Sequence, residues 1–250
     1  MKKEAAPIFG IHAVSEALQA GRSIDKLILR QGGLNDRLKE VKQLARAQNI
    51  PVQTVPDIRL DRLSKGEPHQ GVVAIAAAIS FQSLEKLLLA WHEAKYQPLL
   101  VMLDGVTDVR NFGAIARSCE VMGADALVVP AKRSAAANGD ALRASAGALN
   151  HLALCRETNL IDTVMLLQAY DIRCIAMDEK IDRSIFDMEL QGSLCLIFGS
   201  EEKGITPSVL KRVDEKGSIP QQGQTSSLNV SVSVGMALLE ATRQRAPGLA

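Results

Sequence analysis

Apolar residues in the first 80 positions recur with two periods, one typical of helices and one typical of strands. Stripes with a spacing of three or four residues predict helices over residues 11–20, 34–48 and 58–63. Short apolar runs between these stripes predict strands over residues 26–30, 51–55 and 72–79. Because helices alternate with strands, residues 1–80 are predicted to form a small α/β domain.

The same alternation continues beyond a helical stretch at residues 81–97, which Pro98 closes and which we interpret as a connector. Short, strongly apolar runs predict strands over residues 99–103, 126–129, 151–156, 172–177 and 193–198, and one ending at Ile219. Helical stripes are predicted over residues 111–122, 160–170 and 207–212, and from Val230 onward. Residues 98–250 are therefore predicted to form an α/β domain with a parallel sheet, whose ligands bind at the carboxyl ends of the strands.

Residues 219–245 combine a polar loop with an apolar helix that is predicted to be largely buried. Ser226, Ser227 and Asn229 stand at the entrance of this helix, where free backbone N–H groups and the positive end of the helix dipole collect. Two interpretations stay open here. The polar residues are either an N-cap with spare polar neighbours or a ligand-binding surface.

Two more predicted strand ends carry polar residues. Asn111, in the loop after residue 103, is predicted to cap the next helix, on which Arg117 lies one turn beyond Gly113. The missing side chain of Gly113 is expected to leave room beside the Arg117 guanidinium. Arg117 is either a solvated helix charge or a clamp for an oxyanion or phosphate. Glu201 follows the strand that ends near Gly199. The chain has no GxGxxG motif, which argues against an ordinary dinucleotide-binding site.

The charge balance excludes a globally basic protein, since 29 Lys and Arg face 28 Asp and Glu. Any nucleic-acid site must therefore be a local patch. Lys132 and Arg133, with Arg143 further on, form a basic segment after a predicted strand. This segment either grips a phosphate backbone or is a solvated loop. Aromatic residues make up 3% of the chain, which argues against a row of base-stacking platforms.

The cysteines lie singly in apolar runs and form no CxxC pair. They are Cys119, Cys155, Cys174 and Cys195. This pattern favours buried, reduced thiols over a metal site. The sequence contains neither a signal sequence nor an apolar run of about 18 residues, so we expect a cytoplasmic protein without a membrane span.

Three segments resemble the signature motifs of one enzyme family. NFGAIAR at 111–117, FGSEEKGI at 198–205 and SSLNVSVSVGMALLEA at 226–241 are similar, in order and wording, to the motifs of the SpoU (TrmH) family of RNA 2′-O-ribose methyltransferases, within the SPOUT class. The FGIHAV and HQGVVA segments near the N-terminus resemble the ribosomal-protein-L30e-like substrate-binding domain of its ribosomal members. The nearest resemblance is to members that methylate a guanosine in the P loop of large-subunit (23S) ribosomal RNA.

The resemblance implies a trefoil-knotted methyltransferase domain, a homodimer packed through that domain, and S-adenosylmethionine as cofactor. The cofactor-binding positions implied by the motifs are Gly199, Ile219, Ser227, Leu228 and Asn229. The implied catalytic positions are Asn111, Arg117, Glu201, Ser227 and Asn229, with Arg117 matching the catalytic arginine.

These residue types fit the implied reaction. A ribose 2′-hydroxyl is a poor nucleophile until its proton is removed or its developing charge is stabilised. A guanidinium has a pKa above about 12 and is a poor base. We therefore expect Arg117 to stabilise the alkoxide or clamp the adjacent phosphate, while another group accepts the proton.

The first motif departs from the family pattern, because Val109 and Arg110 follow Asp108 where a proline is usual. Arg110 is therefore a further candidate for RNA contact. The departure keeps three functions open: a guanosine methyltransferase of ribosomal RNA, a transfer RNA 2′-O-methyltransferase, and a catalytically silent RNA-binding or ribosome-assembly protein. The joint presence of Arg117, Glu201, Ser227 and Asn229 favours an enzyme.

Overall fold

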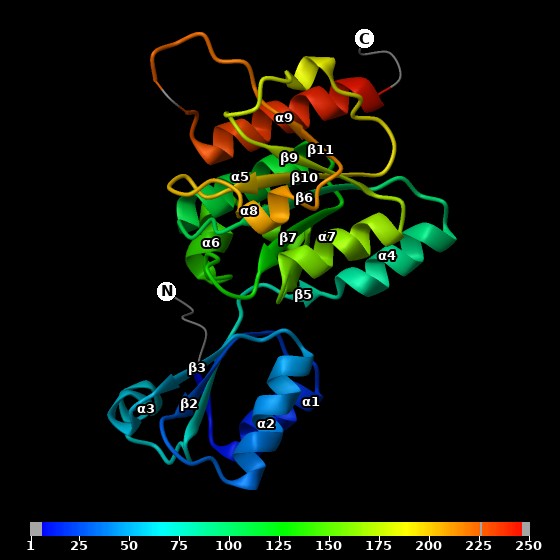
Figure 1. The fold of residues 1–250 in the computed structure, drawn as a ribbon. Coiled ribbons are helices and arrows are strands. Elements are labelled where there is room, and N and C mark those ends of the chain that lie inside the picture. The colour runs from blue at the N-terminus through cyan, green and yellow to red at the C-terminus, as the bar shows by residue number, and fades with distance from the viewer. Residues whose placement is uncertain (1–6, 226, 247–250) are drawn as a thin grey trace. The chain divides into compact units, whose positions relative to one another are not determined.

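The computed structural model describes residues 7–225 and 227–246, which form two compact units (Figure 1). Unit 1 extends to Ser80 and includes residues 136–140, and unit 2 contains residues 81–135 and the chain from 141 onward. The segment 81–97, expected to be a connector, packs within unit 2. Its strand β5 (Phe81–Gln82) pairs with β8 (Ala153–Glu157), and its helix α4 (Leu84–Glu93) buries two leucines in the core of unit 2.

Unit 1 is a four-stranded mixed sheet in the order β1-β4-β2-β3. Its elements are β1 (Pro7–Phe9), α1 (Ile11–Gln19), β2 (Ile24–Arg30), α2 (Asp36–Ala47), β3 (Val52–Val55), α3 (Asp57–Ser64) and β4 (Val72–Ala76). Successive side chains of β2 point to opposite faces of the sheet, which gives unit 1 two buried clusters. Leu27 and Leu29 pack with α1 and α2, whereas Ile28 packs with α3. The three predicted helices and three predicted strands are confirmed, and the short strand β1 was missed.

Unit 2 is built on a parallel sheet of seven strands in the order β11-β9-β10-β6-β7-β8-β5, all within the described residues. Its further strands are β6 (Leu99–Asp104), β7 (Ala126–Pro130), β9 (Arg173–Met177), β10 (Leu194–Gly199) and β11 (Glu215–Gly217). Its further helices are α5 (Val109–Val121), α7 (Leu160–Ala169), α8 (Pro207–Leu210) and α9 (Val230–Arg245), with short 3₁₀ turns at Ala148–Asn150 and Ile185–Asp187. Helix α6 (Gly139–Ala144) begins with two residues assigned to unit 1 and continues in unit 2. The predicted parallel α/β fold is confirmed.

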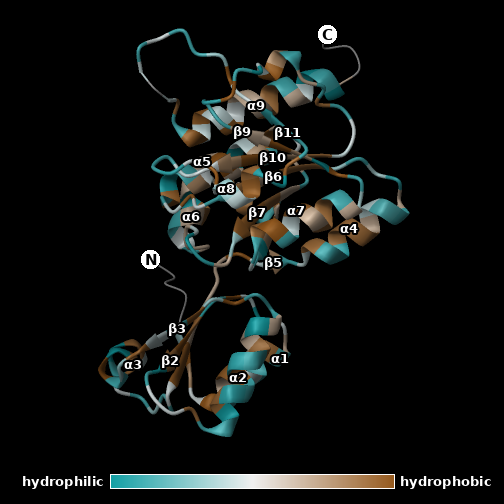
Figure 2. Cartoon of the chain, viewed as in Figure 1, coloured by the Kyte–Doolittle hydropathy of each residue, from teal (hydrophilic) through white to brown (hydrophobic). Residues whose placement is uncertain are grey.

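Both faces of the unit 2 sheet are covered. Leu100 and Met102 of β6 share a buried cluster with α4 and α7, while α5 and α9 pack together over the other face (Figure 1). Figure 2 shows the hydrophobic colour concentrated in the strands and the hydrophilic colour on the outer sides of the helices. None of the helices in the described part of the chain is long and apolar enough to cross a bilayer.

Three expectations for unit 2 are wrong in detail. Helix α5 is capped by Asp108, whose carboxylate accepts from the N–H groups of residues 110 and 111, so Asn111 lies inside the first turn and its side chain is free for other contacts. The last strand ends at Gly217, before Ile219, and Ser218 forms an isolated bridge with Ser184. Helix α9 is buried along one stripe, but its outer face is apolar and exposed.

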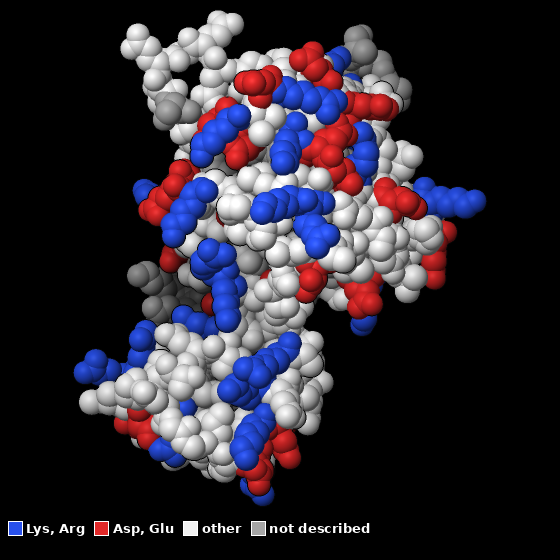
Figure 3. Space-filling view, viewed as in Figure 1, with Lys and Arg blue, Asp and Glu red and all other residues white. Residues whose placement is uncertain are grey.

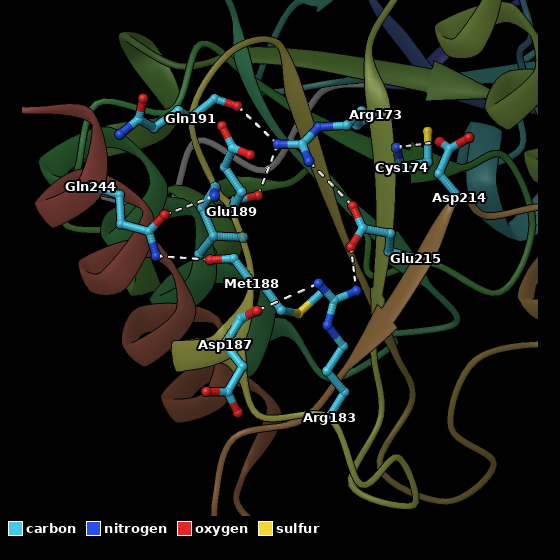
Figure 4. A network of polar contacts seen from close by, with 11 residues as sticks. Arg173, Cys174, Arg183, Asp187, Met188, Glu189, Gln191, Asp214, Glu215 and Gln244 are labelled. Atoms are coloured by element: carbon cyan, nitrogen blue, oxygen red, sulfur yellow. Dashed lines mark hydrogen bonds and ion pairs between the residues drawn. The ribbon is translucent and has the colours of Figure 1, made fainter.

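A polar network anchors α9 at the opposite end of the sheet from the candidate site (Figure 4). Gln244 accepts from the N–H of Leu190 at 2.8 Å and donates to the carbonyl of Met188 at 3.1 Å. Beside it, Glu215 of β11 accepts from both Arg173 and Arg183. These bonds tie the C-terminal end of α9 and the strand β11 to residues 183–191.

Candidate active site

Four neighbouring strands, β9, β10, β6 and β7, end at the same edge of the sheet because they are parallel. Gly199 at the end of β10 lies opposite Asp104 at the end of β6. The Asp104 side chain is buried, with 5% of the residue exposed, and accepts from the backbone N–H of Thr206 at 2.7 Å. This bond joins the end of β6 to the loop that follows β10.

The loop after β10 folds back tightly on its own strand. The backbone groups of Ser200 and Gly204 exchange hydrogen bonds of 3.2 and 2.8 Å. A Cβ atom at Gly199 would lie 2.0 Å from the carbonyl carbon of Gly204, a distance that real side chains essentially never show. Glycine is therefore required at 199 by the close approach of two backbone segments.

Polar residues from the three sequence motifs meet at this edge. The amide of Asn111 donates to Glu201 Oε1 at 2.8 Å, and the amide of Asn229 donates to the same oxygen at 2.8 Å. The Asn229 amide also lies 3.1 Å from Asn111 Oδ1, while Asn229 Oδ1 caps α9 by accepting from the N–H of Ser231. We call Asn111, Glu201 and Asn229 the polar triad. Of the two interpretations that the sequence left open, the N-cap is confirmed for Asn229, whose side chain also joins a cluster.

A pocket of about 150 Å³ opens beside the triad, and we call it the strand-end pocket. Four of the five positions expected to bind a cofactor line it: Gly199, Ile219, Ser227 and Leu228. Asn229 lies outside this lining and inside the triad. Ser226 lies outside the described residues.

The strand-end pocket also contains residues that the sequence analysis missed. Residues 177–180, which include Asp178 and Glu179, follow β9 and form part of its wall. One signal could have identified them. Residues 172–177 were predicted as a strand, and the carboxyl ends of parallel strands lie at the same edge of the sheet. No sequence pattern marked the segment as unusual.

A second pocket, of about 380 Å³, lies on the other side of the loop after β10, and we call it the outer pocket. Residues 200–204 and Val230 line both pockets, so the loop forms a shared wall. Asn111, Asp108 and Arg133 also line the outer pocket. The structure therefore brings one residue of the predicted basic segment, Arg133, next to the polar triad.

Arg117 occupies a different place. It is exposed on α5, lines neither pocket, and has no hydrogen-bond or ion-pair partner among the residues that the structure describes. The space expected beside it at Gly113 is filled, since a Cβ there would lie 2.3 Å from Cβ of Ala144. Arg117 shares its stripe of α5 with Val121, one turn further on, which is 66% exposed.

The other basic residues expected to contact RNA are at the surface. The Arg110 side chain is 91% exposed and lies 3.7 Å from Asp108, whose pKa is held below its usual value mainly by the backbone N–H of Asn111. Lys132 and Arg143 are exposed as well. Figure 3 shows basic and acidic side chains intermixed on the visible face of unit 2, in keeping with the balanced charge of the chain.

The cysteines are buried free thiols, as expected. Burial raises the pKa of Cys119 far above its usual range and that of Cys155 to about 12. Such thiols are inert at neutral pH. Within residues 7–225 and 227–246, no group of three or more His, Cys, Asp or Glu side chains is placed to hold a metal ion.

The fold and the site define a class: an α/β protein with a parallel sheet and a pocket where its central strands end. The particular family follows from comparison with known proteins. The chain belongs to the SpoU rRNA methylase family, whose family model matches residues 98–239. A second model, for the RNA 2′-O ribose methyltransferase substrate-binding domain, matches residues 7–82.

Individual relatives agree with this membership. The chain is 35% identical over 242 residues to the 23S rRNA (guanosine-2′-O-)-methyltransferase RlmB of Escherichia coli K12, covering 95% of this chain and 98% of the relative. The SpoU methyltransferase AviRb of Streptomyces viridochromogenes, in complex with the cofactor AdoMet, matches with a TM-score of 0.59 and 25% identity over 95% of this chain and 89% of its own. The A. aeolicus TrmH/SpoU tRNA modifying enzyme matches with a TM-score of 0.54 and 26% identity over 64% of this chain and 83% of its own.

Proposed function

We propose that this protein transfers a methyl group from S-adenosylmethionine to the 2′-hydroxyl of a guanosine in large-subunit ribosomal RNA. The observation that carries the proposal is the polar triad, in which three separate motifs meet between two pockets. One pocket suits the cofactor and the other suits the acceptor. A silent RNA-binding protein would have no chemical need for this arrangement.

The residues that line the strand-end pocket suit the chemical groups of the cofactor. Gly199 lets the backbone of the loop approach closely, and Ile219 and Leu228 provide apolar surface for a purine. Asp178 and Glu179 place carboxylates in the wall, which suits the ribose hydroxyls and positive charge of S-adenosylmethionine. When bound, this cofactor supplies an activated methyl group on sulfur.

The polar triad is well placed to orient the acceptor. Glu201 lines both pockets and accepts hydrogen bonds from two amides, which hold its carboxylate in one position. A fixed carboxylate and amide can orient a ribose hydroxyl in line with the methyl group, and such positioning is a large part of catalysis. Ser227, exposed at the mouth of the strand-end pocket, is available as a further hydrogen-bonding group. Arg117 lines neither pocket, so it would supply positive charge for the alkoxide or the adjacent phosphate only at the interface of the homodimer proposed below.

The comparisons favour ribosomal RNA over transfer RNA as the substrate. The similarity to RlmB extends over both units, whereas the tRNA modifying enzyme covers 64% of the chain. The P loop of the large subunit is our proposal for the target region, on the strength of the resemblance between motifs. We place the reaction in the cytoplasm, where buried thiols such as Cys119 stay reduced.

Methyl transfer to RNA from cells that lack this protein tests the proposal. Labelled S-adenosylmethionine and the purified protein should label large-subunit ribosomal RNA or its assembly intermediates, and RNA from wild-type cells should accept little label. Labelling of transfer RNA alone would support the alternative substrate. Absence of both labelling and cofactor binding would support a silent RNA-binding protein.

Unit 1 is proposed to hold the RNA substrate as an L30e-like domain. A hollow in this unit is lined by the first residues of α1, by Asn35 and Arg37 at the start of α2, and by Arg30 at the end of β2. Asp61 and Asp57, which pairs with Arg30, line it as well. Arginine side chains and helix N-termini are the groups that contact phosphates. Unit 1 would then position a ribosomal RNA segment while unit 2 carries out the chemistry.

Charge reversal in the basic segment should weaken RNA binding. The combined change Lys132→Glu, Arg133→Glu and Arg143→Glu is expected to lower affinity and to reduce the slope of log K against log salt by about 0.7 to 0.9 for each phosphate that the protein no longer neutralises. Fluorescence anisotropy at several salt concentrations measures both quantities. A double change at exposed lysines on and after α4, Lys86→Glu with Lys95→Glu, is the control for charge reversal elsewhere in unit 2. An unchanged slope in the triple variant would show that the segment is a solvated loop.

The homodimer is proposed to form through the outer face of α9. Val232, Met236 and Leu239 are 48%, 44% and 59% exposed, and their spacing places them on one stripe. Val121 of the neighbouring helix α5 extends this apolar surface. A stripe of this kind on a monomer suggests a protein interface. Arg117, one turn from Val121, would lie at its margin and near an active site at the interface.

Leu239→Glu should convert the dimer into a monomer, because a charge in the centre of an apolar interface has no partner. Light scattering coupled to size-exclusion chromatography measures the change. Met165→Glu is the matched control, since Met165 is 49% exposed on α7, away from this stripe. A Leu239→Glu variant that keeps the mass of a dimer would refute the proposed interface.

We also infer that the chain after β10 forms the implied trefoil knot. The bonds between Ser218 and residues 183–185 support this, because they hold the chain after β11 against the chain after β9. Mechanical extension of the protein by its two ends should stop short of the full contour length, since a knot tightens and shortens the chain. Extension to the full length would contradict the knot.

A further inference from the structure

We propose that the outer pocket receives the base of the target nucleotide, and that Glu202 recognises the Watson–Crick edge of a guanine there. The inference rests on the proposed function and adds to it a base-binding site and a specificity-determining residue. It follows from the position of the pocket, from its carboxylates and from the donor pattern of the bases.

The outer pocket lies next to the place where the reaction is proposed to occur. The outer pocket and the strand-end pocket are separated by the loop of residues 200–204, and Glu201 lines both. A ribose held at the polar triad would therefore have the cofactor on one side and the outer pocket on the other. The volume of about 380 Å³ is large enough for a nucleobase. A base can enter only when it is turned out of an RNA stack, as in other enzymes that act on single nucleotides.

Four carboxylates line the outer pocket, and three of them are already engaged. Asp104 is buried and accepts from the N–H of Thr206, and Asp108 caps α5. Glu201 accepts from two amides in the polar triad. Glu202 is exposed, and no hydrogen bond or ion pair joins its side chain to any residue that the structure describes. Glu202 is therefore the carboxylate with acceptor capacity to offer a ligand.

A free carboxylate selects guanine among the four bases. Guanine presents N1–H and the N2 amino group side by side, and a carboxylate can accept from both. Adenine, cytosine and uracil lack this pair of adjacent donors. Arg133 lies in the same lining and carries the opposite charge, so it can hold a phosphate of the turned-out nucleotide.

The test combines the Glu202→Gln variant with an RNA in which the target guanine lacks one functional group, the N2 amino group. A ribosomal RNA fragment with its mapped target guanosine is compared with the same fragment carrying inosine, which lacks the N2 amino group. The wild-type protein should lose about ten- to a hundredfold in kcat/KM on inosine, as expected for one hydrogen bond to a charged group. Glu202→Gln keeps one acceptor oxygen but sets an amide donor against N1–H, so it should lose a similar factor on guanosine, and inosine should then cost it less than it costs the wild-type protein, because both changes act on the same contact.

Controls separate the possible outcomes. Glu93→Gln removes an exposed carboxylate of α4 outside the pockets and should keep the full discrimination against inosine. Equal rates of the wild-type protein on both RNAs, or undiminished discrimination by Glu202→Gln, would overturn the inference. Calorimetry with S-adenosylmethionine tests whether Glu202 contacts the cofactor instead of the base. In that case the Glu202→Gln variant would bind the cofactor more weakly and would still discriminate against inosine as strongly as the wild-type protein does. If the wild-type protein methylates no RNA at all, the proposed function itself fails.

Discussion

Replacement of Arg117 by alanine is expected to lower kcat for RNA methylation by about 100- to 1,000-fold, the usual loss when a group that stabilises developing negative charge is removed. The affinity of the Arg117→Ala variant for S-adenosylmethionine should stay unchanged, because Arg117 does not line the strand-end pocket. The fold should also be intact, since Arg117 is exposed and makes no hydrogen bond or ion pair within the described part of the chain. Single-turnover methylation and calorimetry measure the two effects.

The role of Arg117 is distinguished by Arg117→Lys. If the residue stabilises charge, lysine should restore part of the lost activity and leave the pH profile unchanged through neutral pH. If it acts as a base, lysine should retain much of the activity with an inflection moved to lower pH, because an ammonium loses its proton more readily than a guanidinium. Arg212→Ala removes an exposed arginine elsewhere in unit 2 and serves as the control. Full activity of Arg117→Ala would exclude both roles.

Gly199→Ala is expected to lower the free energy of unfolding by about 3 kcal/mol and to abolish cofactor binding. The new Cβ would lie 2.0 Å from the Gly204 carbonyl carbon and 2.2 Å from the backbone nitrogen of Ile205, so the loop between the two pockets must move. Backbone atoms cannot yield as a flexible side chain can. Urea denaturation and calorimetry with S-adenosylmethionine measure these losses.

Gly223→Ala is the matched control for this change. A Cβ at Gly223 would meet no atom within 4 Å, so stability should change by less than about 1 kcal/mol. The comparison separates the close approach at 199 from the general effect of replacing a glycine in unit 2. Cofactor affinity that survives in Gly199→Ala would mean that the loop position is unimportant for the strand-end pocket.

The sequence predicted the α/β class, most elements and the strand ends at which the site lies. This worked because buried parallel strands such as β6 and β10 are continuous apolar runs bounded by glycine and polar residues. The strands β1 and β5 escaped prediction, since two or three residues carry too little pattern and depend on partners far along the chain. Two equally good caps, Asp108 and Asn111, stand three residues apart, and local propensity could not decide between them.

Prediction of the site from the sequence was limited in the same way, because its geometry depends on residues far apart in the chain. The motifs named Asn111, Glu201 and Asn229, but their mutual hydrogen bonds depend on contacts across 28 to 118 positions in sequence. Apolar composition predicted that α9 is largely buried, whereas the structure leaves Val232, Met236 and Leu239 exposed. A hydrophobic face looks the same in sequence whether a core or a partner protein covers it. The space at Gly113 likewise depended on Ala144, which no local pattern pointed to.

The most direct test of the central claim is ribose-methylation mapping of ribosomal RNA from cells that lack this protein, before and after incubation with the protein and S-adenosylmethionine. We predict that a 2′-O-methyl group appears at a single guanosine of the large-subunit RNA, and that Arg117→Ala does not produce it. A methyl group on a base, or no new ribose methylation in naked RNA and in ribosomal precursors alike, would contradict the account.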